Sequence, residues 1–450
     1  MSECNTELTV RESQPGRSAP ELTELGTHWE QALEQLGQEL DLEETARRSG
    51  ALVRRRGVRS AKDLLRIVLG YSVLDWSLRL LGGWCVVVGL ADISSTALLK
   101  RLRQCRVWLG LLVMAVLRRQ KGLCPPPGCL RVKVVDASVL CQPGSRGTDW
   151  RLHLGFDLGR MCLDWLQVTD ASGGESLSRF AWGPGDLAMV DRGYALRREV
   201  GHVLGAGAWL LVRIGWLKLP LEDRVGQPFD LIGWLTPAHP SPADPLREVE
   251  VWVSTPAGRF ALRLIAQALP EPAVEKARRR LRQAARKKGR TADERSLVAA
   301  AFLLLLTNLP PAQWSAPQVL LLYRFRWQIE LAFKRLKSLL HLDGLRTRDP
   351  ELVQVYLLAK LLAALLLDQA QLHLTTQYPG WFASQERPLS VWRLTALLWD
   401  EIRHIVRGPV TLNRILIAFP KLRRFLCEPP RKRLSQRVLA QRLLGGLCGC

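Results

Sequence analysis

The segment YRFRWQIELAFKRLKSLL, residues 323–340, combines four polar residues of chemical interest with a regular apolar pattern. Tyr323, Arg326, Glu330 and Lys337 are separated by three, four and seven residues, so an α-helix with about 3.6 residues per turn places all four close to one face. Beside them runs an apolar stripe that can anchor the helix to a core, made of Phe325, Ile329, Ala332, Phe333, Leu336 and Leu340. A carboxylate flanked on its own face by an arginine, a lysine and a phenol suits a metal-dependent site that handles phosphate.

Two aspartates upstream of this helix are the other candidate acidic groups. Asp136 follows the largely apolar run Val132–Val135, and Asp191 follows Leu187–Val190, so each carboxylate is expected at the end of a buried strand. With Glu330 projecting from a helix packed over them, the three carboxylates can bind two divalent ions, which activate the attacking oxygen and stabilise the leaving oxygen of a phosphoryl displacement. Magnesium fits a set of hard oxygen ligands, and Mn²⁺ can substitute for it.

The basic and phenolic side chains near this triad are candidates for DNA contact, namely Tyr323, Arg326, Lys337, Lys334 and Arg192. Arg326 and Lys337 can neutralise phosphate charge, and Tyr323 can donate a hydrogen bond to a phosphate or stack on a base. An ordinary structural interpretation stays open for each residue. Arg326 and Lys337 could simply pair with Glu330 across helical turns, and an aspartate after a strand is most often a turn former or a helix cap. Other aspartates compete by position, namely Asp149, Asp157, Asp164, Asp170 and Asp186.

The composition favours a soluble protein with a polyanionic partner. The chain has 450 residues, 47% of them hydrophobic, and carries a formal net charge of +22, which makes nucleic acid the first candidate partner and an anionic membrane surface the alternative. The N-terminus lacks the apolar stretch of a secretory signal, and the longest apolar runs fall short of the roughly 20 residues that span a bilayer. We therefore expect a cytoplasmic protein, associated with the nucleoid when it is bound to DNA. The ten cysteines form no CxxC pair or zinc-type cluster.

The order of patterns along the chain predicts an α/β core with helical regions at both ends. The expected units, in chain order, are a disordered tail (1–20), a helical DNA-binding domain (21–122), a first core part (130–206), a β-rich insertion (207–302), a second core part (303–372) and a helical, basic C-terminal region (373–450). Thr27, Asp41 and Ser60 stand where helix caps are expected, and the proline-rich LCPPPGCL (123–130) reads as a linker.

Four short segments separated by Pro and Gly turns predict the β-rich character of the insertion. They are AWLLVRIG (208–215), FDLIGWL (229–235), REVEVWVS (247–254) and GRFALRLIAQAL (258–269). Nine basic residues then lie between Lys276 and Arg290. We expect a helix followed by a loop there, which either contacts a phosphate backbone or is a solvated face.

The spacing Tyr-x2-Arg-x3-Glu-x6-Lys, complete here from Tyr323 to Lys337, resembles the signature of one large branch of bacterial insertion-sequence DDE transposases. VVDAS (134–138) resembles the first-aspartate strand of that family, and MVDRGYAL (189–196) resembles its second-aspartate block. ASGGESLSRF (171–180) resembles the strand-and-turn region between them. Glu330 lies 139 positions after Asp191, which leaves room for the β-rich insertion of this branch.

This resemblance, which covers roughly residues 90–370, implies an RNase H-like core with Asp136, Asp191 and Glu330 as the metal-binding triad. It also implies cut-and-paste transposition of double-stranded DNA between terminal inverted repeats and target DNA, through a hairpin, by a homodimer holding paired ends. The branch captures a flipped base with a tryptophan of the insertion. The candidates, among which the sequence does not choose, are Trp209, Trp216, Trp234, Trp252 and Trp314.

Three other functions remain open from the sequence. A decayed or repurposed copy would bind DNA without cutting it, and a structure-selective nuclease with the same core would cut without joining. A non-enzymatic nucleic-acid-binding protein fits the net charge equally well, but it leaves the paired aspartates and the polar helical stripe unexplained.

Overall fold

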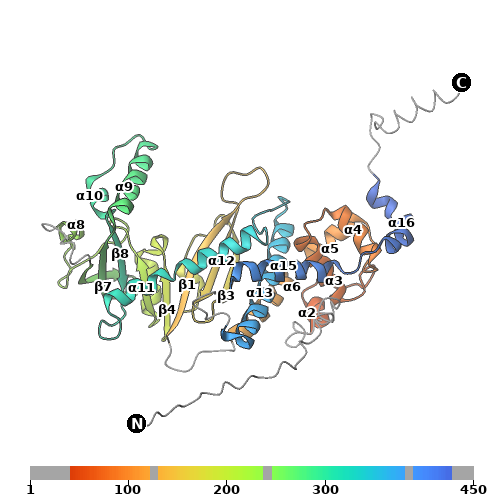
Figure 1. The fold of residues 1–450 in the computed structure, drawn as a ribbon, viewed down its shortest axis with the longest axis horizontal. Coiled ribbons are helices and arrows are strands. Elements are labelled where there is room, and N and C mark those ends of the chain that lie inside the picture. The colour runs from red at the N-terminus through yellow and green to blue at the C-terminus, as the bar shows by residue number, and fades with distance from the viewer. Residues whose placement is uncertain (1–40, 122–129, 237–245, 381–388, 428–450) are drawn as a thin grey trace, which may run out of the picture.

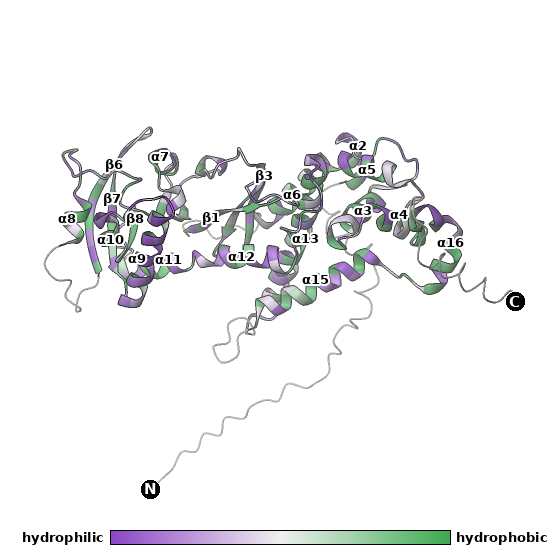
Figure 2. Cartoon of the chain, turned by 90° about the horizontal axis from the view of Figure 1, so that it is seen from above, coloured by the Kyte–Doolittle hydropathy of each residue, from purple (hydrophilic) through white to green (hydrophobic). Residues whose placement is uncertain are grey.

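A computed structural model describes residues 41–121, 130–236, 246–380 and 389–427. The molecule is elongated, with the strands of the insertion at one end and the N-terminal helices at the other (Figures 1 and 2). The caps expected at Asp41 and Ser60 are confirmed, since Asp41 caps α2 (Leu42–Arg48) and Ser60 caps α3 (Ala61–Val73). The expected disordered tail, Thr27 and most of the proline-rich linker lie outside the described residues.

One mixed sheet of eight strands runs through the molecule in the order β3-β2-β1-β4-β5-β8-β7-β6. β1, β2 and β3 pair antiparallel, whereas β1 pairs in parallel with β4 and β4 with β5. These five strands form an RNase H-like core, which confirms the predicted fold class. The strands are β1 (Arg131–Leu140), β2 (Trp150–Asp157), β3 (Cys162–Asp170), β4 (Asp186–Val190), β5 (Trp209–Arg213), β6 (Leu246–Thr255), β7 (Gly258–Ala268) and β8 (Phe302–Thr307).

Side chains alternate between the two faces of the core strands, as the two-residue period of a strand requires. Val134 and Met189 pack on one face in the apolar core that contains α12 (Trp327–Ser338) and α13 (Pro350–Gln377). Their neighbours Val135 and Val190 pack on the other face, against α7 (Arg197–Gly205). Figure 2 shows α12 and α7 on opposite sides of the sheet. Both faces are therefore covered, so these strands are nearly continuously apolar.

The helices at the two ends of the chain pack together around α13. The N-terminal set continues with α4 (Leu78–Val87), α5 (Ser95–Gln104) and α6 (Arg106–Lys121), and the C-terminal set is α15 (Val391–Arg407) and α16 (Leu412–Leu426). α13 contacts α3, α5, α6 and α15, while α16 contacts α4. α15 alternates hydrophobic and hydrophilic residues along its length (Figure 2). The helical region that precedes the core thus shares its apolar interior with α13 rather than standing apart.

One helix corrects the expectation that every apolar run is too short to cross a bilayer. α13 has 28 residues and is long and apolar enough to do so by length and composition. However, 72% of its most apolar window is buried inside the protein. Helices at the centre of soluble proteins are also long and apolar. The contacts of α13 with α3, α5, α6 and α15 support the role of a central packing helix.

Three local predictions were wrong. Residues 323–340 form two helices instead of one, because α11 (Ala316–Arg324) ends before α12 begins, and Phe325 at the break is 45% exposed. FDLIGWL forms a short helix, α8 (Leu231–Leu235), capped by Asp230, instead of a strand. β1 continues to Leu140, so Asp136 lies within a strand and not at its end.

The segment predicted as the insertion contains strands of two kinds. β5 lies in the core sheet beside β4, whereas β6 and β7 form a hairpin that continues the sheet through β8. Its basic residues lie on α9 (Glu271–Arg286) and in the turn that precedes α10 (Glu294–Ala299). Figure 1 shows α9 and α10 projecting from the end of the sheet.

Candidate active site

Asp136 on β1 and Asp191 directly after β4 lie side by side. Val135 of β1 is paired with Val190 of β4, and each aspartate is the next residue along its strand direction. Asp191 is the first residue after β4 and precedes the short 3-10 helix η2 (Arg192–Tyr194). The structure thus brings together two carboxylates that are 55 residues apart in the sequence.

The electrostatic surroundings of Asp136 confirm that several charged groups meet here. Burial raises the pKa of Asp136 to about 6, and the negative charges of Glu175 and Asp191 add to this rise. The backbone N–H of Ala137, which donates to its Oδ1 at 2.8 Å, and the positive charge of Arg326 act in the opposite direction. Asp136 is therefore close enough to these residues for their charges to affect it.

The hydroxyl of Tyr323 lies next to the second aspartate. Its ring is buried in the core that α12 also joins, and its hydroxyl lies 3.4 Å from Oδ1 of Asp191 and 3.5 Å from the carbonyl oxygen of Val190. Burial raises the pKa of the Tyr323 phenol, and the charge of Asp191 raises it further. The phenol is therefore a permanent hydrogen-bond donor at this position.

Arg326 connects the helix pair to the aspartates. It is the residue that precedes α12, and its Nη2 lies 2.5 Å from Oε1 of Glu330. Burial opposes the charge of Arg326, but Tyr323, Glu330 and Asp191 together outweigh burial and raise its pKa. The pairing of Arg326 with Glu330, which the sequence left as an alternative, is present in the structure.

The remaining candidates for DNA contact are Lys337, Lys334 and Arg192. Nζ of Lys337 donates to the carbonyl oxygen of Val139 on β1 at 3.1 Å. Nζ of Lys334 lies 5.5 Å from the ring centroid of Trp392 on α15, and Arg192 is exposed beside Asp191. Lys337 and Lys334 therefore make contacts of their own within the protein.

The three proposed metal ligands do not converge on one point. Among the residues that the structure describes, no group of three or more His, Cys, Asp or Glu side chains is placed to hold a metal ion as it stands. The donor set itself, three carboxylates, matches the hard oxygen ligands that Mg²⁺ and Mn²⁺ prefer. Asp136 and Asp191 are adjacent, and the carboxylate of Glu330 is turned to Arg326.

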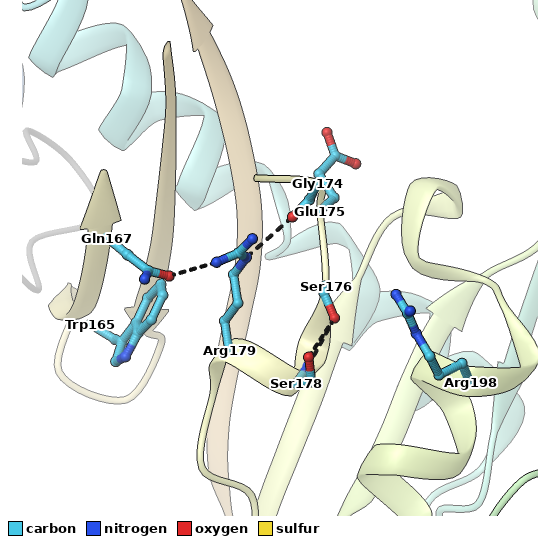
Figure 3. A pocket seen from close by; sticks show the side chains of 8 residues that line it. All are labelled: Trp165, Gln167, Gly174, Glu175, Ser176, Ser178, Arg179 and Arg198. Atoms are coloured by element: carbon cyan, nitrogen blue, oxygen red, sulfur yellow. Dashed lines mark hydrogen bonds between the residues drawn. The ribbon is translucent and has the colours of Figure 1, made fainter. Parts of the chain in front are cut away.

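A polar cleft of about 580 Å³ adjoins the site (Figure 3). The sequence did not predict this cleft. The side chains lining it include Trp165, Gln167, Ser178 and Arg198. Arg179 crosses the cleft, donating to Oε1 of Gln167 at 3.0 Å and to the carbonyl oxygen of Gly174 at 3.2 Å. Glu175, at the edge of this cleft, belongs to the quoted GGES motif, and that motif is the one sequence signal that could have drawn attention to it.

Two of the candidate tryptophans of the insertion make definite contacts. Nε1 of Trp216 donates to Oγ of Ser296 at 3.0 Å, and the guanidinium of Arg259 lies 4.6 Å from the ring centroid of Trp252. Both rings are therefore engaged within the insertion, and neither is singled out for base capture.

The RNase H-like sheet, with two aspartates side by side and a Tyr-Arg-Glu group on the helices above them, defines a protein of the DDE nucleic-acid-processing class. Residues 128–366 match the family described as the transposase DDE domain, which is more than half of the chain. The chain therefore belongs to this family of DNA-cleaving and strand-transferring enzymes, which depend on divalent metal ions.

The chain is also similar to transposases from Escherichia coli and Bacillus thuringiensis. The chain is 38% identical over 347 residues to the putative transposase InsL for insertion sequence element IS186A of Escherichia coli K12, covering 76% of this chain and 93% of that protein. It is 38% identical over 348 residues to the Escherichia coli transposase for element IS421, with the same coverage. The transposase for element IS231F of Bacillus thuringiensis subsp. israelensis is 25% identical over 272 residues, or 52% of this chain and 55% of its own.

A solved structure with partial likeness is the cryo-EM structure of the piggyBac transposase synaptic complex with hairpin DNA. It aligns with 91% of this chain and 89% of its own at 11% identity. The TM-score of 0.46 is too low for this likeness to support a conclusion about the present chain.

Proposed function

We propose that this chain is the transposase of an insertion sequence, which cuts double-stranded DNA at the terminal inverted repeats of its element and joins the freed 3′-hydroxyls to target DNA. The observation that carries the proposal is the register of β1 and β4, which places Asp136 beside Asp191 under the Tyr323–Arg326 turn. This is an arrangement of acidic and basic groups suited to phosphodiester chemistry.

Asp136, Asp191 and Glu330 are the residues that would hold the divalent ions, with Mg²⁺ as the native metal and Mn²⁺ as a substitute. When bound, two such ions would lower the pKa of the attacking water or hydroxyl and stabilise the leaving oxygen. Binding requires the Glu330 carboxylate to exchange its contact with Arg326 for the metal. Arg326 and Glu330 are four residues apart, about one helical turn, so their side chains lie on the same face.

The chain's own basic and phenolic groups would orient the DNA phosphate. Arg326 has a planar, permanently charged guanidinium that can move from Glu330 to a phosphate oxygen once the carboxylate holds metal. Tyr323 donates from a fixed position next to Asp191, which keeps that carboxylate oriented. Lys337, Lys334 and Arg192 would contact the DNA backbone farther from the reacting bond.

The proposed substrate and assembly follow from the same family. The helical region within residues 42–121 and the basic helix α9 are candidate surfaces for the element end, and the active unit would be a homodimer that pairs two ends. The hairpin route, in which the freed 3′-hydroxyl attacks the opposite strand, belongs to this proposal. The protein would act in the bacterial cytoplasm, associated with the nucleoid while bound to DNA.

The experiment that tests the proposal is an assay on a labelled duplex ending in the inverted repeat that flanks the gene, with Mg²⁺ or with EDTA. We expect metal-dependent nicking at the element end followed by joining, abolished by Asp136→Asn and unaffected by Glu250→Gln, an exposed carboxylate on β6. Binding without metal-dependent nicking would identify a non-catalytic DNA-binding protein. Cutting without joining would identify a nuclease.

A further inference from the structure

The polar cleft beside the active site has the size and the lining of a site for a small polar ligand. Its volume of about 580 Å³ falls within the range of roughly 300–1,000 Å³ that is typical of ligand sites. The described side chains that line it are two arginines, two serines, a glutamine, a tryptophan and one glutamate. Positive charge, hydrogen-bond donors and an aromatic ring are the groups that bind the phosphates and bases of unpaired nucleic acid.

The first arginine of the cleft, Arg179, is fixed by neutral groups only. It ends the 3-10 helix η1 (Leu177–Arg179), and its Nε and Nη1 donate to the carbonyl oxygen of Gly174 and to Oε1 of Gln167. Among the described residues no carboxylate forms an ion pair with Arg179, and no partner contacts its Nη2. Because a guanidinium carries five N–H donors, Arg179 keeps both a full positive charge and free donors for an anion.

The second arginine, Arg198, lies on the other side of a pair of serine hydroxyls. Figure 3 shows Ser176 and Ser178 between the two arginines, and their Oγ atoms are 2.8 Å apart. Nε and Nη2 of Arg198 lie 3.1 and 2.8 Å from Oε1 of the buried Glu199, and its side chain is 73% exposed. Within the described part of the chain Nη1 of Arg198 has no partner. Both arginines are therefore held in position with donors to spare.

The cleft begins next to the second aspartate of the active site. Oε2 of Glu175, at the edge of the cleft, lies 2.8 Å from the point where a Cβ on Gly193 would be, and Gly193 is two residues after Asp191. The Glu175 carboxylate points away from Arg179 and Arg198, so it leaves the space between them to an anion (Figure 3). A DNA strand that has a phosphodiester at Asp191 can therefore continue into the cleft.

We infer that this cleft binds one unpaired nucleotide of a DNA strand at the active site, with its phosphate between Arg179 and Arg198 and its base against Trp165. The inference rests on the proposed function, which brings the strand to the aspartates. Trp165 packs on Phe180 with ring centroids 4.1 Å apart, so its ring is a fixed surface for stacking. The cleft has room for one nucleotide but not for a duplex. The strand belongs either to the flank of the element end or to the target, since both offer the same phosphate and base chemistry.

The test compares paired and unpaired DNA in two assays on the full-length protein. The first measures, by fluorescence anisotropy in EDTA, the affinity for the inverted-repeat duplex with a blunt end and with a single-stranded flank. The second measures, with Mg²⁺, the joining of blunt ends to a fully paired target and to a target with a mismatched segment. We expect the wild type to favour the unpaired DNA in one assay, which identifies the strand, and Arg179→Gln to reduce this preference by about tenfold.

Two further variants separate the cleft from general charge and folding effects. Arg403→Gln removes an exposed arginine of α15, far along the chain from the cleft residues, and should keep the wild-type preference. Ser178→Asp places a negative charge between the arginines without removing the contacts of Arg179. It should lose the preference as Arg179→Gln does, while its affinity for the blunt duplex and its thermal midpoint stay at the wild-type level.

The outcomes distinguish this inference from the proposed function. If Arg179→Gln and Ser178→Asp keep the wild-type preference, or if the wild type shows no preference for unpaired DNA in either assay, the nucleotide site is overturned. Metal-dependent nicking and joining by the wild type would in that case leave the proposed function standing. Absence of metal-dependent nicking by the wild type would instead overturn the proposed function.

Discussion

A buried lysine in α13 makes a quantitative prediction possible. Lys360 lies in the middle of α13 with a fully buried side chain. Its Nζ lies 3.3 Å from a carboxylate oxygen of Asp75 and donates to the carbonyl oxygen of His341 at 2.9 Å. Asp75 stands between α3 and α4, and it also accepts from the Tyr356 hydroxyl at 2.8 Å. The ion pair therefore joins the N-terminal helices to the chain that follows α12.

The perturbation is Asp75→Asn. Asp75 has a φ of 52°, a left-handed conformation that asparagine tolerates as well as aspartate, so the backbone should be unaffected. The substitution leaves a buried ammonium without its counter-charge, which costs about 3–5 kcal/mol of unfolding free energy. Lys360→Met removes the charge and keeps the length of the side chain. We therefore expect the double variant to be more stable than Asp75→Asn alone.

The pH dependence supplies an independent measure of the same pair. Burial lowers the pKa of Lys360 to about 8 from its ordinary 10.5, and Asp75 opposes this shift. Between these two values the unfolded chain binds a proton that the folded protein does not, so unfolding free energy rises with pH in this window. The difference between the two pKa values of Lys360 corresponds to roughly 3 kcal/mol of unfolding free energy, at about 1.4 kcal/mol for each pH unit. Below pH 8 both states are protonated and this contribution is absent.

The assay is urea unfolding of the wild type, both single variants and the double variant at pH 7 and at pH 10. The difference between wild type and Lys360→Met isolates the lysine from all other groups that titrate in this range. We expect the wild type to gain stability relative to Lys360→Met as the pH rises. Parallel pH profiles for these two proteins, or a loss below about 1 kcal/mol in Asp75→Asn at pH 7, where Lys360 is charged, would refute the reasoning.

Three further predictions concern the proposed site and its DNA. Tyr323→Phe keeps the buried ring but removes the donor next to Asp191, so single-turnover nicking should fall about tenfold or more while duplex affinity in EDTA is retained; unchanged nicking would exclude an orienting role. Arg326→Gln frees Glu330 from its ion pair, so calorimetry should show tighter Mn²⁺ binding while nicking falls; weaker Mn²⁺ binding would contradict the proposed exchange. Neutralising three exposed residues of α9 should reduce the salt slope of end binding by up to about 3, and an unchanged slope would make α9 a solvated face; the residues to change to glutamine are Arg279, Arg280 and Arg282.

The core strands could be predicted because their pattern is local. The runs ending at Val135 and Val190 are apolar on both faces, which is typical of strands covered on both sides, and the structure confirms them. What the pattern could not supply was the length of β1. Asp136, Ala137 and Ser138 interrupt the apolar run before Val139 and Leu140, and β2 pairs with the strand through this interruption as far as Leu140. Pairing with a distant strand leaves no mark in the local sequence.

The break between α11 and α12 was missed for a different reason. No proline or glycine marks it, and Phe325 and Arg326 both keep right-handed helical dihedral angles. A stripe with helical spacing therefore survives across the break, because periodicity records side-chain direction and not the continuity of backbone hydrogen bonds. Phe325, at the break, is 45% exposed, so it does not join the apolar stripe that was predicted to anchor the helix.

In the sequence the insertion looked like a separate unit, because its strands are short and divided by turns. In the structure its β6–β7 hairpin contacts the segment that leads to α11, the helix that contains Tyr323. Arg263 of β7, paired with Glu248 of β6, donates to the carbonyl oxygens of Leu309 and Trp314 at 2.8 and 2.9 Å. Both acceptors lie in the turn between β8 and α11, which leads directly to α11 and α12. The insertion therefore cannot shift without pulling on the segment that positions Tyr323 and Arg326. A displacement of the β6–β7 hairpin would therefore be transmitted to Tyr323 and Arg326 through the buried guanidinium of Arg263 and the chain between β8 and α11.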